Sequence, residues 1–176
     1  MVELIEQDFE KNKKIYNKVE NDLKISLGET VKIDHVGSTA IPDIVGKNII
    51  DVLVCANDSA EFEKFKDIIC SEGYFASKNS ASEIYQFFAS RESETGDGDV
   101  HIHLVLKGTE RYEEFLILKE YLLKNKKEAE DYSSFKKELI LNGVTDRKIY
   151  REKKSRYVDN LIKRAKEKIN NKYREE

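Results

Sequence analysis

The chain has 176 residues, a length that suggests a single domain, with 39% apolar residues, 37% charged residues and a formal net charge of −3. No apolar run approaches the roughly 18–20 residues of a membrane span. The N-terminal residues lack the apolar centre of a signal peptide, so we expect a cytoplasmic protein with no membrane partner. The two cysteines lack the paired spacing of a metal site, which indicates two reduced residues in the core.

The first third of the chain reads as a helix followed by two strands. Apolar residues at helical spacing predict a helix over residues 6–26, which Gly28 would end. Residues 31–36 form the first predicted strand and residues 48–55 the second. The second strand is apolar at every position apart from its first residue and Asp51. This pattern predicts a strand inside a sheet that is covered on both faces.

The next segment is predicted to hold one helix and three strands: 58–72, then 74–76, 83–89 and 100–106. The last of these strands alternates regularly between apolar and other residues. Since successive side chains of a strand point to opposite faces, His101 and His103 should lie side by side on one face.

After Gly108 only helical patterns remain: 110–124, 128–141 and 146–173. The order of elements predicts an α+β fold, with a small mixed β-sheet and flanking helices in residues 1–108. Residues 109–176 should form helices packed on this core in one compact unit. The last thirty residues carry twelve Lys or Arg against five Asp or Glu. Their mixed charges favour a solvated helix face, with a nucleic-acid contact as the alternative.

A short polar turn follows the first strand, at Gly37, Ser38 and Thr39. Glycine lets the backbone approach a ligand closely, and the hydroxyl and N–H groups of such a turn suit a phosphate. Lys47, at the start of the next strand, can meet that phosphate as a point charge. Asp51 then adds the carboxylate that a magnesium-nucleotide site needs. The alternative is a plain turn beside a carboxylate paired with a buried cation.

Histidines supply a second group of candidates. His101 and His103 share a strand, and His35 stands just before the polar turn. Gathered around one cleft with Asp51, they can serve as metal ligands or as a general base. Asp51, His101 and His103 are then the candidate catalytic residues and metal ligands, and the cation would be Mg²⁺ or Mn²⁺ rather than Zn²⁺. The alternative gives each histidine only a structural hydrogen bond.

Lysines of the C-terminal helices form a third group. The apolar stripes of these helices must be buried, which places Lys136, Lys154 and Arg156 along or beside the packed seam. We expect some of these three to reach over the cleft and neutralise phosphate charge, whereas Arg164, Lys166 and Lys168 stay in solvent. The alternative leaves all of them solvated.

Together these residues resemble the sequence pattern of the GrpB family. Residues 35–42, then Lys47, then residues 49–54 are similar to the family pattern H-I-G-S-T-A-V-P-G-L-x-A-K-P-I-I-D-I. Residues 101–105 are similar to its H-L-H-V, and residues 118–122 to its F-R-D-Y-L. The resemblance covers nearly the whole chain, because later positions also fit: Ala129, Tyr132, Lys136, Tyr150, Lys154 and Ala165.

The resemblance implies a nucleotidyltransferase-like fold, in which a Gly-Ser turn holds a triphosphate and carboxylates on adjacent strands hold metal. Gly37 and Ser38 would take the first role and Asp51 the second. The chain departs from the active enzymes of that fold, because apolar residues stand two positions before and after Asp51, where an Asp-x-Asp pair would have its other acid. A histidine of the later strand replaces the third acid. Within the family pattern, Asp43 stands where glycine is usual and Asn48 where proline is usual.

Three functions are open from the sequence. The first is a nucleotidyltransferase-like protein that binds a nucleotide or another phosphorylated small molecule, with metal-dependent transfer as its activity. The second is a non-catalytic nucleotide-binding or regulatory module, linked to coenzyme A metabolism because similar domains occur fused to dephospho-coenzyme A kinase. The third is an RNA-associated protein that uses the basic C-terminal helix. A second acid at the site favours the first function, one acid with two structural histidines the second, and a continuous basic groove the third.

Overall fold

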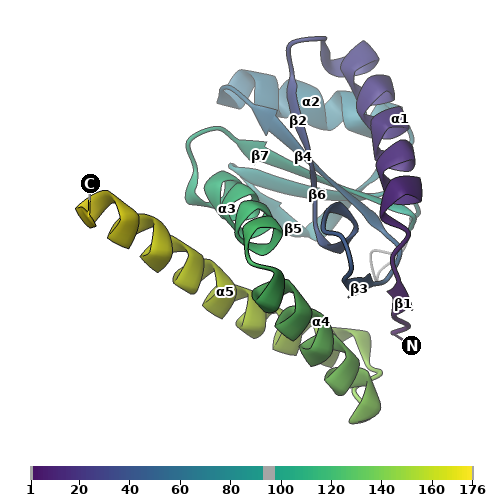
Figure 1. The fold of residues 1–176 in the computed structure, drawn as a ribbon. Helices are drawn as coiled ribbons and strands as arrows, with labels where there is room; N and C mark the ends of the chain where they lie inside the picture. The colour runs from purple at the N-terminus through teal and green to yellow at the C-terminus, as the bar shows by residue number, and fades with distance from the viewer. Residues whose placement is uncertain (1, 93–97, 176) are drawn as a thin grey trace.

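Within residues 2–92 and 98–175, which the computed structural model describes, the centre of the molecule is a five-stranded mixed sheet (Figure 1). Its strands are β2 Lys32–Val36, β4 Ile50–Ala56, β5 Phe75–Ser82, β6 Tyr85–Ala89 and β7 Val100–Leu106. Their order is β2-β4-β7-β6-β5, with β4 and β7 parallel and the other neighbours antiparallel. A separate antiparallel ribbon pairs β1 (Ile5–Glu6) with β3 (Val45–Gly46).

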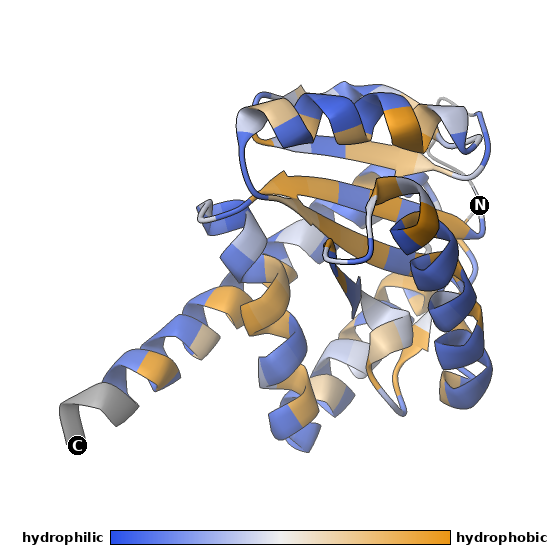
Figure 2. Ribbon diagram, turned by 90° about the horizontal axis from the view of Figure 1, so that it is seen from above, coloured by the Kyte–Doolittle hydropathy of each residue, from blue (hydrophilic) through white to orange (hydrophobic). Residues whose placement is uncertain are grey.

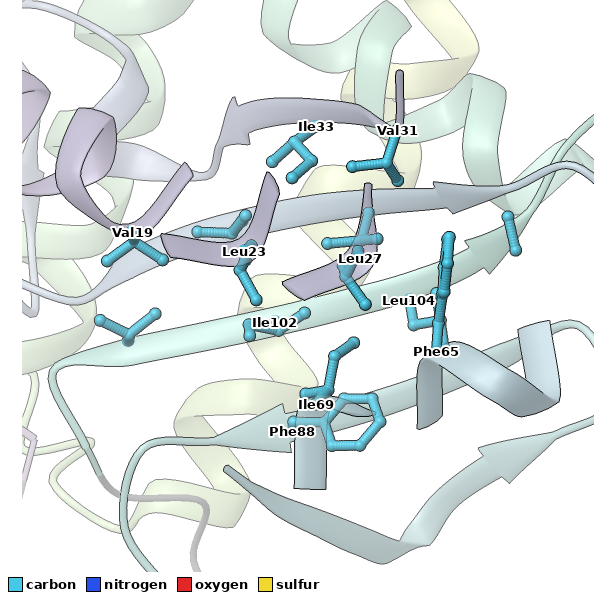
Figure 3. Packing of buried hydrophobic residues seen from close by; sticks show 14 of the residues in the cluster. Val19, Leu23, Leu27, Val31, Ile33, Phe65, Ile69, Phe88, Ile102 and Leu104 are labelled. Carbon is cyan, nitrogen blue, oxygen red and sulfur yellow. The ribbon is translucent and has the colours of Figure 1, made fainter. Parts of the chain in front are cut away.

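Helices cover both faces of this sheet (Figure 1). On one face lie α1 (Phe9–Leu27) and α2 (Ser59–Ser71), and on the other lies α3 (Glu110–Lys124). Figure 2 shows the sheet largely in apolar colours and helices that alternate between apolar and polar positions, as amphipathic helices on a core should. The core beneath α1 and α2 is close-packed aliphatic and aromatic side chains (Figure 3), among them Val19, Leu23, Leu27, Phe65, Ile69, Ile102 and Leu104.

The last two helices, α4 (Lys126–Leu141) and α5 (Arg147–Glu175), pack on α3 and on the segment after the polar turn. That turn forms a short 3-10 helix, η1 (Ser38–Ala40). Ile41 and Ile44, which follow it, are buried in one cluster with side chains of all three C-terminal helices: Tyr121, Leu122, Ala129, Tyr132, Leu161 and Ala165. The helical part is therefore anchored on the same stretch of chain that carries the candidate phosphate-binding turn.

The predicted α+β class and the order of the main elements are confirmed. The structure adds the β1–β3 ribbon, and it extends the strand predicted over 74–76 to residues 75–82 at the edge of the sheet. Both cysteines are free, but Cys70 is exposed, so its expected place in the core is wrong. Among the described residues, none of the helices combines the length and the apolar character that crossing a bilayer requires.

Candidate functional site

The polar turn follows β2 and lies directly against Asp51 of β4. Gly37 has φ of 73°, in the left-handed region, and a Cβ added to it would overlap the Asp51 carboxylate, whose Cγ would lie 2.8 Å away. Glycine is therefore required here both by the backbone conformation and by the close approach of the carboxylate. Gly37 is exposed and Ser38 is half-buried, so the turn is accessible to a ligand.

Asp51 forms the centre of the site, between two histidines of the neighbouring strand. The parallel register sets Asp51 beside His101 and Leu53 beside His103. The Nδ1 atom of His101 and the Nε2 atom of His103 each lie 3.3 Å from the same oxygen, Oδ1 of Asp51. The prediction that these three side chains project from one face, next to the Gly37–Ser38 turn, is confirmed. Burial opposes the charge of Asp51, but hydrogen bonds from both histidines outweigh it and hold its pKa well below the usual range.

A tyrosine that the sequence did not single out completes the surroundings of His103. The hydroxyl of Tyr85 lies 2.9 Å from Nδ1 of His103. Burial lowers the pKa of His103, against the opposing effect of Asp51. A neutral His103 with its proton on Nε2 satisfies both contacts, because it donates to Asp51 and accepts from Tyr85. The strand 83–89 was predicted, but only its pairing with β7 places Tyr85 opposite Val105 and beside His103.

Lys136 of α4 connects the helical part to the polar turn. Its side chain is 1% exposed, and its ammonium nitrogen donates to Ser38 Oγ at 3.0 Å and to the backbone carbonyl of Val45. The same nitrogen lies 4.4 Å from the centre of the Tyr132 ring. Burial and, to a smaller extent, the charge of Lys154 lower the pKa of Lys136 to about 7, against the opposing effect of Asp51. The expected position of Lys136 at the site is confirmed.

Two further lysines were predicted at the site. Lys154 of α5 is half-buried and near enough to Lys136 for its charge to affect that amine. Lys47 follows β3 and is exposed. A phosphate-binding role for Lys47 stays a prediction.

His35 does not belong to this group, so its predicted place in the same cleft is wrong. Its ring stacks on Tyr16 of α1 with ring centres 4.6 Å apart, on the face of the sheet opposite Asp51. Its Nε2 atom lies 2.9 Å from the Thr39 hydroxyl, which in turn donates to the carbonyl of Ile49. Thr39 is 1% exposed as a whole residue, which argues against the direct phosphate contact that the sequence suggested. Burial lowers the pKa of His35 to about 4, which marks it as a neutral structural residue.

The arrangement of Asp51, His101 and His103 does not fit a magnesium or manganese site. Within residues 2–92 and 98–175, metal-ligating side chains nowhere gather in a group of three or more that could hold a cation. Both histidines are directed at one carboxylate oxygen, and Mg²⁺ needs several oxygen ligands. We therefore derive no chemical step through a metal from these residues.

Of the basic residues of α5 that were expected in solvent, Arg164 and Lys166 are instead half-buried and paired with glutamates, whereas Lys168 is exposed as expected. Arg164 Nη2 lies 2.8 Å from Glu128 of α4, and Lys166 lies 2.7 Å from Glu110 of α3. Lys168 Nζ lies 5.2 Å from the centre of the Tyr121 ring. These contacts hold α5 against its neighbours, and they use positive charge that a nucleic-acid groove would need.

Comparisons with known proteins agree with this fold. The family model described as GrpB protein matches residues 2–164. The glutamate-rich protein GrpB of Alkalihalophilus pseudofirmus is 31% identical over 156 residues, which cover 85% of this chain and 88% of that protein. The crystal structure of conserved protein GrpB from Enterococcus faecalis superposes with a TM-score of 0.80 at 22% identity, over 95% of this chain and 99% of that chain.

A more distant likeness extends to a larger enzyme. The structure of Cid1 in complex with its short product ApU superposes with a TM-score of 0.52 at 13% identity, over 75% of this chain and 42% of that chain. The chain therefore corresponds to less than half of that protein. At such identities the likeness establishes the fold, which is nucleotidyltransferase-like.

Proposed function

This chain belongs to the GrpB family, and we propose that it binds a nucleotide or another phosphorylated small molecule at the turn formed by Gly37 and Ser38. The observation that carries the proposal is the contact between Lys136 Nζ and Ser38 Oγ, which brings a buried amine from a helix about a hundred residues away to an accessible turn. Burying a charged lysine costs free energy unless a charged or hydrogen-bonding partner offsets the loss of water, and a phosphate at the serine would be such a partner.

The site supports binding better than metal-dependent transfer. Asp51 has both histidines bonded to one oxygen, and apolar residues occupy the positions two before and two after it. This is the pattern of one acid with two structural histidines, which favours a non-catalytic binding or regulatory module. Transfer chemistry with Mg²⁺ or Mn²⁺ is the alternative, and it draws its support from the nucleotidyltransferase-like fold.

An RNA-associated function is a third candidate. It is suggested by another structural neighbour, a cytoplasmic RNA terminal U-transferase, which superposes with a TM-score of 0.51 at 12% identity. It has less support, because Arg164 and Lys166 of α5 are paired with glutamates. The proposal also includes a cytoplasmic location, which the two free cysteines support.

A thermal-shift screen tests the proposal directly. Nucleotides and coenzyme A precursors are added to the protein with EDTA or with Mg²⁺, Mn²⁺ or Zn²⁺. A ligand at one hundred times its dissociation constant should stabilise the fold by about 2.7 kcal/mol. We expect a ligand to stabilise the wild-type protein in EDTA, and we expect Ser38→Ala to lose this stabilisation. The control is Lys137→Met, which changes an exposed lysine next to Lys136 and should retain the stabilisation. Stabilisation only in the presence of a metal would instead favour transfer chemistry.

A further inference from the structure

The position of Lys136 behind Ser38 limits what kind of phosphate the site can take. At 1% exposure, Lys136 has almost no surface of its own for a ligand, whereas Ser38 is half-buried and Gly37 is exposed. A bound anion would therefore meet the serine hydroxyl, and the hydroxyl oxygen already accepts a hydrogen bond from Lys136 Nζ at 3.0 Å. Ser38 can donate its own hydrogen to the anion, so the lysine acts on the ligand through the serine.

The surroundings of Lys136 suit an ammonium ion but do not neutralise one. Its three polar neighbours are the Ser38 hydroxyl, the Val45 carbonyl and the face of the Tyr132 ring, none of which carries a charge. The charged groups that act on it are Lys154 of α5, which opposes its protonation, and Asp51 of β4, which favours it. Asp51 is already engaged by both histidines. An anion at Ser38 would thus supply the negative charge that this amine lacks.

The tyrosines around Lys136 do not compete for that role. Tyr132 belongs to its own helix, and Tyr150 and Tyr157 of α5 lie close to Tyr132. Burial raises the pKa of Tyr132 and Tyr157, and it raises that of Tyr150 to about 12. All three stay neutral near physiological pH. These tyrosines therefore keep their charge state when a ligand arrives, whereas the charge of Lys136 can change.

The positive charge in direct contact with the turn is limited. Lys136 is buried against Ser38, the charge of Lys154 opposes its protonation, and the residues around Asp51 do not fit Mg²⁺. Enzymes that handle triphosphates use metal ions to neutralise the extra charge. A phosphomonoester carries about −1.5 to −2 at pH 7, which leaves less charge to neutralise than a triphosphate does.

We infer that the ligand is a phosphomonoester or free phosphate, bound without metal, and that Lys136 takes up a proton through its contact with Ser38 when the phosphate arrives. This inference rests on the proposed function, because it assumes that phosphate binds at the Gly37–Ser38 turn. It adds the class of ligand, the absence of a metal requirement and a proton that accompanies binding.

Isothermal titration calorimetry at pH 8, in EDTA and in two buffers with different ionisation enthalpies, tests the inference. At this pH a phosphomonoester is fully dianionic, since its second pKa is about 6, so a proton taken up must come to the protein. The probes are inorganic phosphate, AMP and ATP with Mg²⁺. We expect phosphate and AMP to bind with uptake of up to about one proton, because an amine with a pKa near 7 is mostly neutral at pH 8. Tighter binding of AMP than of phosphate would identify an ester as the ligand, and equal affinities would identify phosphate itself.

Variants test whether Lys136 is the group that takes up the proton. Lys136→Met should abolish the proton uptake and weaken phosphate binding about tenfold or more, whereas Lys137→Met should change neither. If Lys136→Met fails to fold, Ser38→Ala takes its place. It keeps the lysine but removes the contact between Lys136 and Ser38, and it should also reduce the proton uptake. Binding of ATP with Mg²⁺ alone, or binding without proton uptake in the wild type, would overturn the inference and leave the proposed function standing. No binding of any of the three probes would overturn both.

Discussion

At the scale of single residues, the structure makes Gly37 the position on which the site depends. The turn brings the backbone so close to Asp51 that no side chain fits between them. Asp51 in turn is fixed by two histidines on the neighbouring strand. A change at Gly37 would therefore disturb the turn and the carboxylate together.

Gly37→Ala should destabilise the protein more than an alanine placed at a glycine of similar conformation. Gly108 is the matched control, because its φ is 74° but a Cβ added there meets nothing within 4 Å. Gly108→Ala should lose about 1 kcal/mol of unfolding free energy through backbone strain alone. Gly37→Ala should lose at least about 1 kcal/mol more, because of its overlap with Asp51. Urea denaturation measures both, and equal losses would mean that the close approach to Asp51 has no energetic weight.

Lys136 should make the stability of the unliganded protein rise with pH above neutrality. Its pKa is about 7 in the folded state, against an ordinary value of 10.5 for a lysine in the unfolded chain. Between these values the unfolded chain holds a proton that the folded chain has released, so raising the pH favours folding. From pH 7 to pH 9 the unfolding free energy should increase by at most about 1.4 kcal/mol per pH unit. Lys136→Met should lack this increase in urea titrations, and the same slope in both proteins would show that Lys136 is not the group that titrates.

At the scale of elements, α5 is held by ion pairs that come from two other helices. Arg164 reaches Glu128 of α4 and Lys166 reaches Glu110 and Glu114 of α3. These pairs are partly exposed, so each adds little, while the buried residues Leu161 and Ala165 contribute most of the packing. The ion pairs set the orientation of α5, the helix that also carries Lys154.

Reversing the charge of Arg164 should destabilise the protein by roughly 0.5–1 kcal/mol, and reversing its partner as well should restore most of the loss. The variants are Arg164→Glu, Glu128→Arg and the double change, compared by thermal unfolding at low and high salt. Lys163→Glu on the same helix is the control, and should have a smaller effect that does not depend on Glu128. Additive losses in the double variant would contradict the pairing.

At the scale of the whole molecule, the sequence predicted the α+β class and the grouping of Asp51, His101 and His103, because strand alternation is a local property. It could not place His35, since its face follows from the antiparallel register of β2 with β4, where His35 lies opposite Val52. Tyr85 was missed for the same reason. The pairing of Arg164 with Glu128 depends on how α4 and α5 pack against each other, and a local sequence pattern does not predict this packing. Long-range contacts thus account for most of what the sequence left out.

The departures from the family pattern also have a structural reading. Asp43, which stands where glycine is usual, has φ of 61°, a conformation that glycine adopts freely and aspartate tolerates. Asn48, which stands where proline is usual, has φ of 57°, which proline cannot adopt. Proline at this position would therefore require a different course of the loop before β4.

The proposed site binds phosphate at the Gly37–Ser38 turn with the help of Lys136. The most direct measurement is an NMR titration of the ¹⁵N-labelled protein with inorganic phosphate in EDTA, which reports on every backbone amide. We predict saturable shifts centred on the amides of Gly37, Ser38 and Thr39, and their loss in Lys136→Met but not in Lys137→Met. Shifts centred on the exposed residues of α5 instead, or shifts at the turn that Lys136→Met leaves unchanged, would contradict the claim.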